Sequence, residues 1–112
     1  MTKDGSWRLR ALWRDDRTLA TMTIDLAVSE GRVASRYDLF GAFDLDGDAP
    51  KPFILRRDGR IDFGGPDEQV WRTDLRDADI FVGGHFNIFF NEQDSGLYRI
   101  VKLARPGIRE IQ

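Results

Sequence analysis

The sequence predicts a mainly β protein: an antiparallel meander that closes into a small barrel of seven or eight strands or folds into a bent sandwich. Several segments alternate apolar and polar residues, which is typical of half-buried strands. Short stretches rich in Gly, Asp, Asn and Pro separate them and favour tight local connections. With 112 residues, the chain is expected to form a single β-rich domain in which residues 105–112 are a peripheral tail.

The N-terminal part is expected to form three consecutive strands. In each, large apolar residues recur at alternate positions, so that one face packs into a core. The third strand is expected to turn Tyr37 and Phe43 inward. Gly31 suits the turn before it, because glycine accepts the positive φ that such turns require. The expected strands are residues 7–14, 19–28 and 32–43.

The central part combines a hairpin with the one segment that could be helical. Residues 53–63 alternate around an Asp-Gly pair, which is a strong signal for a tight hairpin turn. Pro52 cannot donate a backbone hydrogen bond, so we expect it in the loop before this hairpin. Residues 66–78 begin with Pro and acidic residues and place apolar residues at helical spacing, which favours a short helix. A strand through Trp71 is the alternative.

The C-terminal segment, residues 81–103, is predicted to be a β-hairpin with two apolar faces. A solvated antiparallel sheet shows one apolar and one polar face, so here something must cover the second face. The cover could be more of this chain, a second copy, a partner or a ligand. The side chains expected to face it include a polar stripe beside the aromatic end of the first strand. The predicted binding residues are His85, Asn87, Phe89, Tyr98 and Ile100.

Charge limits the choice of partners. The net charge of −2 gives no overall field that would attract nucleic acid. Arg8, Arg10 and Arg14 form a basic stripe on the first strand, and with nearby aromatic residues such a stripe would suit a single-stranded nucleic acid. The acidic balance of the chain argues against that partner, so we expect no nucleic acid.

Composition also bounds the compartment. The chain has no cysteine, which excludes disulfide bonds, thiolate metal sites and a cysteine nucleophile. The first residues lack the apolar core of a signal peptide. No apolar run reaches the length that spans a bilayer. We therefore expect a cytoplasmic protein with no membrane partner.

One acidic loop is a candidate cation site. Asp44, Asp46 and Asp48 place three carboxylates on alternate residues, and calcium prefers several oxygen ligands from a turning loop. An EF-hand would need glycine where Ala49 stands and glutamate where Leu55 stands. A solvated turn is the favoured interpretation, so we expect no resident metal and no cofactor.

His85 is the only histidine and the only candidate catalytic residue. A general base needs a positioned substrate and usually a carboxylate that orients it. No Gly-x-Ser-x-Gly elbow is present, so a serine nucleophile has no support. The favoured interpretation of His85 is a surface or half-buried side chain beside a bend at two glycines.

The start of the first strand resembles a known family. Gly5-Ser6-Trp7, with a late arginine at Arg99 or Arg105, is similar to the G-x-W opening of calycin barrels, the lipocalin and avidin-type proteins. The resemblance implies that the tryptophan closes the barrel floor and that the arginine packs on it. It also implies a small-ligand barrel. The interior lining would then be Trp7, Met22, Tyr37 and Phe86.

Three functions from different classes follow from these observations. The first is a non-enzymatic binding or assembly module that offers an apolar face of the C-terminal hairpin to a protein partner or to a second copy. The alternative is a calycin-like barrel that holds a small apolar ligand. The second alternative is a small enzyme that uses His85 with a neighbouring Asp or Tyr37.

Overall fold

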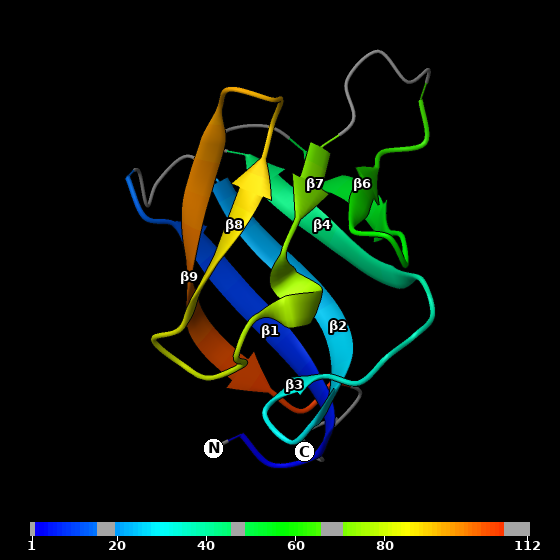
Figure 1. Cartoon of the computed structure of the whole chain (residues 1–112), viewed down its shortest axis with the longest axis vertical. Coiled ribbons are helices and arrows are strands. Elements are labelled where there is room, and N and C mark those ends of the chain that lie inside the picture. The colour runs from blue at the N-terminus through cyan, green and yellow to red at the C-terminus, as the bar shows by residue number, and fades with distance from the viewer. Residues whose placement is uncertain (1, 16–19, 46–48, 66–70, 107–112) are drawn as a thin grey trace.

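The protein is a closed, eight-stranded antiparallel barrel with one further strand outside it (Figure 1). The computed structural model describes residues 2–15, 20–45, 49–65 and 71–106. These residues contain no α-helix, and hence no helix long and apolar enough to cross a membrane. The strands are β1 (Gly5–Trp13), β2 (Ala20–Ser29), β3 (Arg32–Val33), β4 (Leu39–Leu45), β5 (Lys51–Leu55), β6 (Arg60–Asp62), β7 (Trp71–Thr73), β8 (His85–Phe89) and β9 (Ser95–Ala104), and a 3₁₀ turn, η1 (Leu75–Asp77), precedes β8.

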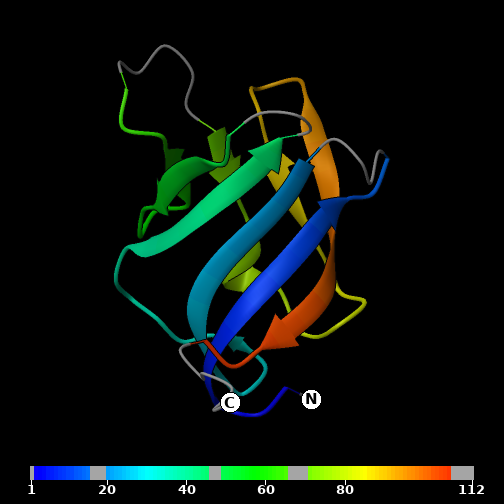
Figure 2. The ribbon, with the colours of Figure 1, turned by 180° about the vertical axis from the view of Figure 1, so that it is seen from behind.

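The strands follow one another around the barrel as a meander, which confirms the predicted fold class. Each barrel strand pairs with the next one along the chain, and β9 closes the sheet by pairing with β1. The short strand β3 pairs only with the end of β2 and lies outside the barrel. Figure 2 shows the wall formed by β1, β2 and β4 from behind. A closed barrel leaves few unpaired strand edges.

The first hairpin forms as the alternation of its residues predicts. Leu9 pairs with Ile24 and Ala11 with Met22, so the inward side chains of β1 and β2 meet in the core. The turn after β2 contains Glu30 at φ 54° followed by a glycine, which is the backbone that a two-residue turn requires.

The expected third strand, residues 32–43, is wrong as one element. It divides into β3, a loop over residues 34–38 and β4. Tyr37 lies in this loop with 81% of its surface exposed, so it does not line the interior. The physical reason is that side chains take the backbone hydrogen bonds that a continuous strand would make with its neighbours. The Arg76 guanidinium donates to the carbonyls of Ser35 and Tyr37. The Ser35 hydroxyl accepts a hydrogen bond from the Ala27 amide.

The predicted central hairpin is present as β5 and β6, although Pro52 lies within β5, opposite Ala42. The expected helix over residues 66–78 is wrong where the structure describes it, because residues 71–78 form β7 and η1. Residues 66–70 lie outside the described part. Tertiary contacts favour the strand, because the Trp71 ring packs edge-on against the rings of Phe43, Phe63 and Phe90.

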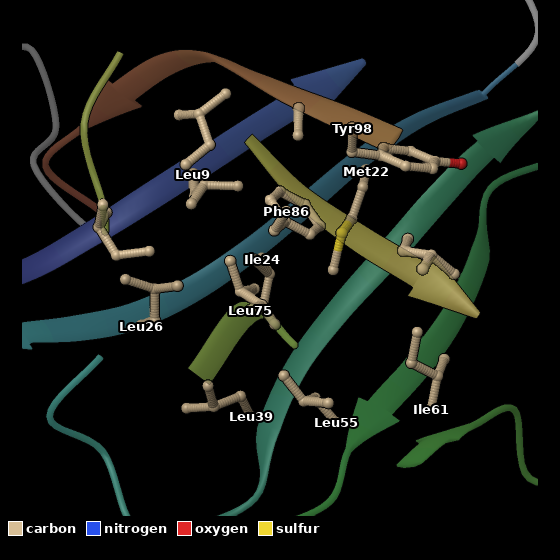
Figure 3. Close-up of a cluster of buried hydrophobic side chains, with 14 of the residues drawn as sticks. Leu9, Met22, Ile24, Leu26, Leu39, Leu55, Ile61, Leu75, Phe86 and Tyr98 are labelled. Carbon is tan, nitrogen blue, oxygen red and sulfur yellow. The ribbon is translucent and has the colours of Figure 1, made fainter. Parts of the chain in front are cut away.

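The buried apolar side chains form one cluster that fills the barrel interior. Leu9, Met22, Phe86 and Tyr98 come from different strands and project into the same space (Figure 3). Phe43 connects the cluster to the aromatic end of the barrel, with neighbouring ring centroids 4.9 to 6.2 Å away. Along the described strands, side chains therefore fill the interior as in a packed core.

Candidate functional site on the outer face of the C-terminal hairpin

Tyr98 and Ile100 point into the barrel, which corrects the expectation that they face a partner. Each is at most 1% exposed. Directly paired residues lie on the same face of a sheet, and Tyr98 pairs with the core residue Phe86, its ring stacked at 5.8 Å between centroids. Burial raises the pKa of Tyr98 to about 12. These two residues hold the hairpin on its core and leave the opposite set of side chains outside.

The register of the hairpin is set by its turn. The Asn91 side-chain oxygen accepts hydrogen bonds from the backbone amides of Gln93 and Asp94, each at 2.7 Å. The Phe90 amide donates to the Asp94 carbonyl at 2.9 Å. This turn aligns Ile88 with Gly96 and so decides which alternate residues of β9 face inward. Because the turn is long and has no single type, the strand register of the hairpin could not be predicted from the sequence pattern.

The outward side chains of β8 and β9, together with Leu12 of β1 and Arg14 just after it, form a continuous face that we call the outer hairpin surface. β8 and β9 lie side by side (Figure 1), with β1 paired to the far side of β9. Three of the predicted binding residues, His85, Asn87 and Phe89, belong to it. The outer hairpin surface comprises Leu12, Arg14, His85, Asn87, Phe89, Leu97, Arg99 and Val101.

Two hollows interrupt this side of the barrel. The first measures about 160 Å³ and combines an apolar floor with basic side chains. Trp13 also contributes to it, and the Trp13 Nε1–H is a buried donor with no acceptor among the described residues. The second measures about 430 Å³ and includes Arg72 and the exposed Phe89. The residues around the first hollow are Leu12, Trp13, Arg14, His85, Arg99 and Val101, and those around the second are Arg72, Phe89, Asn91 and Glu92.

Basic side chains oppose one another across the strands of this wall. Like charges placed directly opposite each other destabilise a sheet. Of the basic residues that oppose one another on this wall, Arg60 alone forms an ion pair within the described part of the chain, with Asp58 at 2.9 Å. At the edge of the surface, the Asp74 carboxylate accepts hydrogen bonds from the backbone amide and the side-chain amide of Asn87. The directly opposed pairs of like charge are Arg10 with Lys102 and Arg60 with Arg72.

Of the candidate catalytic and metal residues, the structure describes His85 and Asp44. His85 is exposed opposite Arg99, and no hydrogen bond to its side chain occurs within the described part of the chain. Asp44 is exposed in β4, whereas Asp46 and Asp48 lie outside the described residues. No group of three or more potential metal ligands occurs in residues 2–15, 20–45, 49–65 and 71–106.

Leu12 and Arg72 are not among the residues that the sequence predicts for a site, and Arg99 is there only a possible partner of the tryptophan in the calycin resemblance. Arg14 had been noted as part of a basic stripe, but the closure of β1 onto β9 is what brings it beside the hairpin. A signal for this surface is present in the sequence, because arginines stand at outward-facing alternate positions of the first and last strands. They become neighbours when these two strands pair and close the barrel.

The opposite end of the barrel carries the residues of the calycin resemblance. The Arg105 guanidinium lies over the Trp7 ring, 3.8 Å from its centroid, and Arg105 Nη1 donates to the Ser6 carbonyl at 3.2 Å. Arg105, an exposed residue, therefore contacts the start of β1, whereas Arg99 lies on the outer hairpin surface. No family model, curated protein or solved structure matches the chain, so the resemblance stays a prediction that rests on Gly5 to Trp7.

Proposed function

We propose that the protein is a non-enzymatic binding module that holds an anionic partner against the outer hairpin surface. One observation carries the proposal: the first hollow is lined by the apolar Leu12 and Val101 together with Arg14, Arg99 and His85. Arginine and aromatic residues are enriched in protein interfaces, and apolar contact together with charge complementarity gives both affinity and orientation. This partner would cover the apolar residues on the outer face of the C-terminal hairpin, the face for which the sequence predicts a cover.

The enzymatic alternative has less support from the same geometry. A general base is usually oriented by a second group, and within the described residues His85 faces Arg99 rather than a carboxylate. Tyr37, the other residue considered for this role, lies in the loop before β4 on a different wall of the barrel. We therefore assign His85 a contact role in the proposed binding.

The small-ligand alternative also has less support. Of the expected lining residues, Met22 and Phe86 are buried in the packed cluster and Tyr37 is on the outside. The two hollows described above are lined mainly by outward side chains of the barrel wall. A ligand inside the barrel would have to displace core side chains, which costs packing energy. We further propose a cytoplasmic location, since a chain without cysteine needs no oxidising compartment to fold.

The proposal is tested by titrating the labelled protein with two polyanions, heparin and poly-L-glutamate, while recording amide NMR spectra. We expect shifts concentrated in β8, β9 and the end of β1, weakened by salt because the contacts are ionic. Arg99→Gln should weaken binding several-fold. The matched control Arg36→Gln, an exposed arginine in the 34–38 loop, should leave binding unchanged.

Two results would contradict the proposal. The first is the absence of shifts with either polyanion at low salt. The second is a set of shifts centred on the loop that contains Arg36. Light scattering across protein concentrations, in the same buffer, identifies the case in which a second copy occupies the surface, because the mean mass then rises with concentration.

A further inference from the structure

Basic side chains gather across four neighbouring strands of the barrel. The chain carries a net charge of −2, yet β1, the residue after it, β9 and β7 present five exposed basic side chains. Within the described residues none of the five forms an ion pair. Net charge alone therefore misrepresents what a partner meets on these strands. The five are Arg10, Arg14, Arg72, Arg99 and Lys102.

Three carboxylates on the neighbouring strands and turns are bound to other groups, whereas Asp15, next to Arg14, is an exposed acidic residue. Asp25 holds Arg8 through two hydrogen bonds of 2.8 and 3.0 Å. Asp58 is bound to Arg60, and Asp74 to Asn87, as described above. Glu92 remains as an acidic residue at the rim of the second hollow. An added polyanion would relieve the repulsion between the opposed basic side chains without displacing an internal partner.

An exposed aromatic ring lies within this basic area. Phe89 is 39% exposed and pairs directly with Arg72 across β8 and β7. On the other side of β8, the first hollow begins at His85 and Arg99. Proteins that bind single-stranded nucleic acid combine basic side chains along the phosphate backbone with aromatic rings on which bases stack. An acidic peptide would use the arginines but has no planar bases to place on Phe89.

The shape of the wall favours a single strand over a duplex. The major groove of DNA admits an α-helix or a projecting two-stranded ribbon. The described residues contain no α-helix, and the tip of the β8–β9 hairpin carries Glu92 and Asp94, which would repel phosphates. The basic side chains lie instead on the barrel wall, where an unpaired strand can follow them.

We infer that the anionic partner of the outer hairpin surface is a single-stranded nucleic acid, whose backbone follows Arg14 and Arg99 and continues onto the neighbouring Arg10, Lys102 and Arg72, and one of whose bases stacks on Phe89. The inference rests on the proposed function and names the partner of that surface. It departs from the expectation drawn from the acidic balance of the chain, because the pairing of β9 with β1 and of β8 with β7 adds Arg72, Arg99 and Lys102 to the basic stripe of the first strand. Arginine suits phosphate better than lysine, since its planar fork donates two hydrogen bonds at once.

The test measures fluorescence anisotropy of a labelled oligothymidylate and a labelled oligouridylate, each about 16 nucleotides long, with the intact chain. We expect salt-dependent binding in which Arg99→Gln reduces the slope of log affinity against log salt by about 0.7. Phe89→Ala should lower the affinity about fivefold or more without changing that slope. Phe40→Ala, an exposed phenylalanine on β4, and Arg36→Gln are the matched controls and should bind as the unchanged protein does.

The outcomes separate this inference from the proposed function. If heparin or poly-L-glutamate binds the outer hairpin surface and neither oligonucleotide does, the inference is overturned and the proposed function stands. If no polyanion binds, both fail. If the oligonucleotides bind equally well to Phe89→Ala, or if a duplex of the same length binds more tightly, the inference is also overturned. Each variant is accepted only if its thermal melting curve and circular dichroism match those of the parent protein.

Discussion

Replacing Arg76 with methionine is expected to destabilise the protein by about 2–4 kcal/mol, mainly by freeing the 34–38 loop from the barrel. The Arg76 guanidinium lies between three segments that are far apart in the sequence, and it donates to backbone carbonyls rather than to a carboxylate. Burial lowers its pKa from the usual value, which shows that the surroundings partly desolvate the cation. The acceptors are the carbonyls of Ser35 and Tyr37 at 2.8 Å, and those of Leu55 and Arg56 at 3.2 Å.

The magnitude follows from these four contacts. A hydrogen bond to a charged group contributes about 1.5–3 kcal/mol net, and the two bonds of 2.8 Å to Ser35 and Tyr37 are the better ones. The two longer bonds add less, and the freed loop carbonyls recover water because the loop is on the surface. Desolvation of the cation offsets part of the gain. Methionine retains much of the apolar stem of Arg76. The loss of unfolding free energy therefore measures the hydrogen bonds of the guanidinium rather than the packing of the stem.

The assay is urea unfolding followed by far-ultraviolet circular dichroism, with thermal melting as a second measure. For 112 residues, a loss of 1 kcal/mol lowers Tm by about 4 °C. Arg76→Lys should fall between the two proteins, because an ammonium keeps the charge but cannot reach several carbonyls at once. Arg36→Met is the control on the exposed side of the same loop. A loss below about 0.5 kcal/mol for Arg76→Met, or full stability with lysine, would refute the reasoning.

Three further predictions concern the core. Gly41→Ala should cost about 2 kcal/mol or more in urea unfolding, because a Cβ there would lie 2.6 Å from the Thr23 carbonyl oxygen, whereas Gly65→Ala, with open space around it, should not share this clash. Phe43→Ala should cost about 3–5 kcal/mol by the same assay, as its ring joins the two parts of the core; a loss under about 1 kcal/mol would contradict that role. Tyr98 should ionise near its raised pKa of about 12 in an ultraviolet titration, so its contribution to stability is complete below pH 10 and is lost as the pH rises toward 12; ionisation of Tyr98 near pH 10 with the fold intact would contradict the burial.

Local alternation was enough to predict the first hairpin, because the inward side chains of β1 and β2 follow a strict period of two. It failed wherever contacts distant in the sequence decide the outcome. Tyr37 has the parity of an inward residue, but Arg76, which is 39 positions away, holds its backbone in a loop. Trp71 has helical spacing to Leu75, yet its ring is placed by phenylalanines of other strands. A local pattern contains none of this information.

The candidate site was predicted in part for the same reason. His85, Asn87 and Phe89 were assigned to a contact face, and the structure places them together on the outer wall. Tyr98 was assigned to the wrong face, since the hairpin turn that fixes its register has no single type. The basic side chains of the other strands joined the site only when the sheet closed, which is a property of the whole chain.

The ladder between β1 and β9 gives the terminal strands a protective role. It joins Arg8 to Ala104, and it is the one pairing of the barrel that spans nearly the whole described chain. Removing β9 would convert the cylinder into an open sheet whose two unsatisfied borders, β1 and β8, could recruit strands from other molecules. Proteolytic trimming at the carboxyl side of the hairpin tip should therefore produce aggregates rather than a smaller soluble domain.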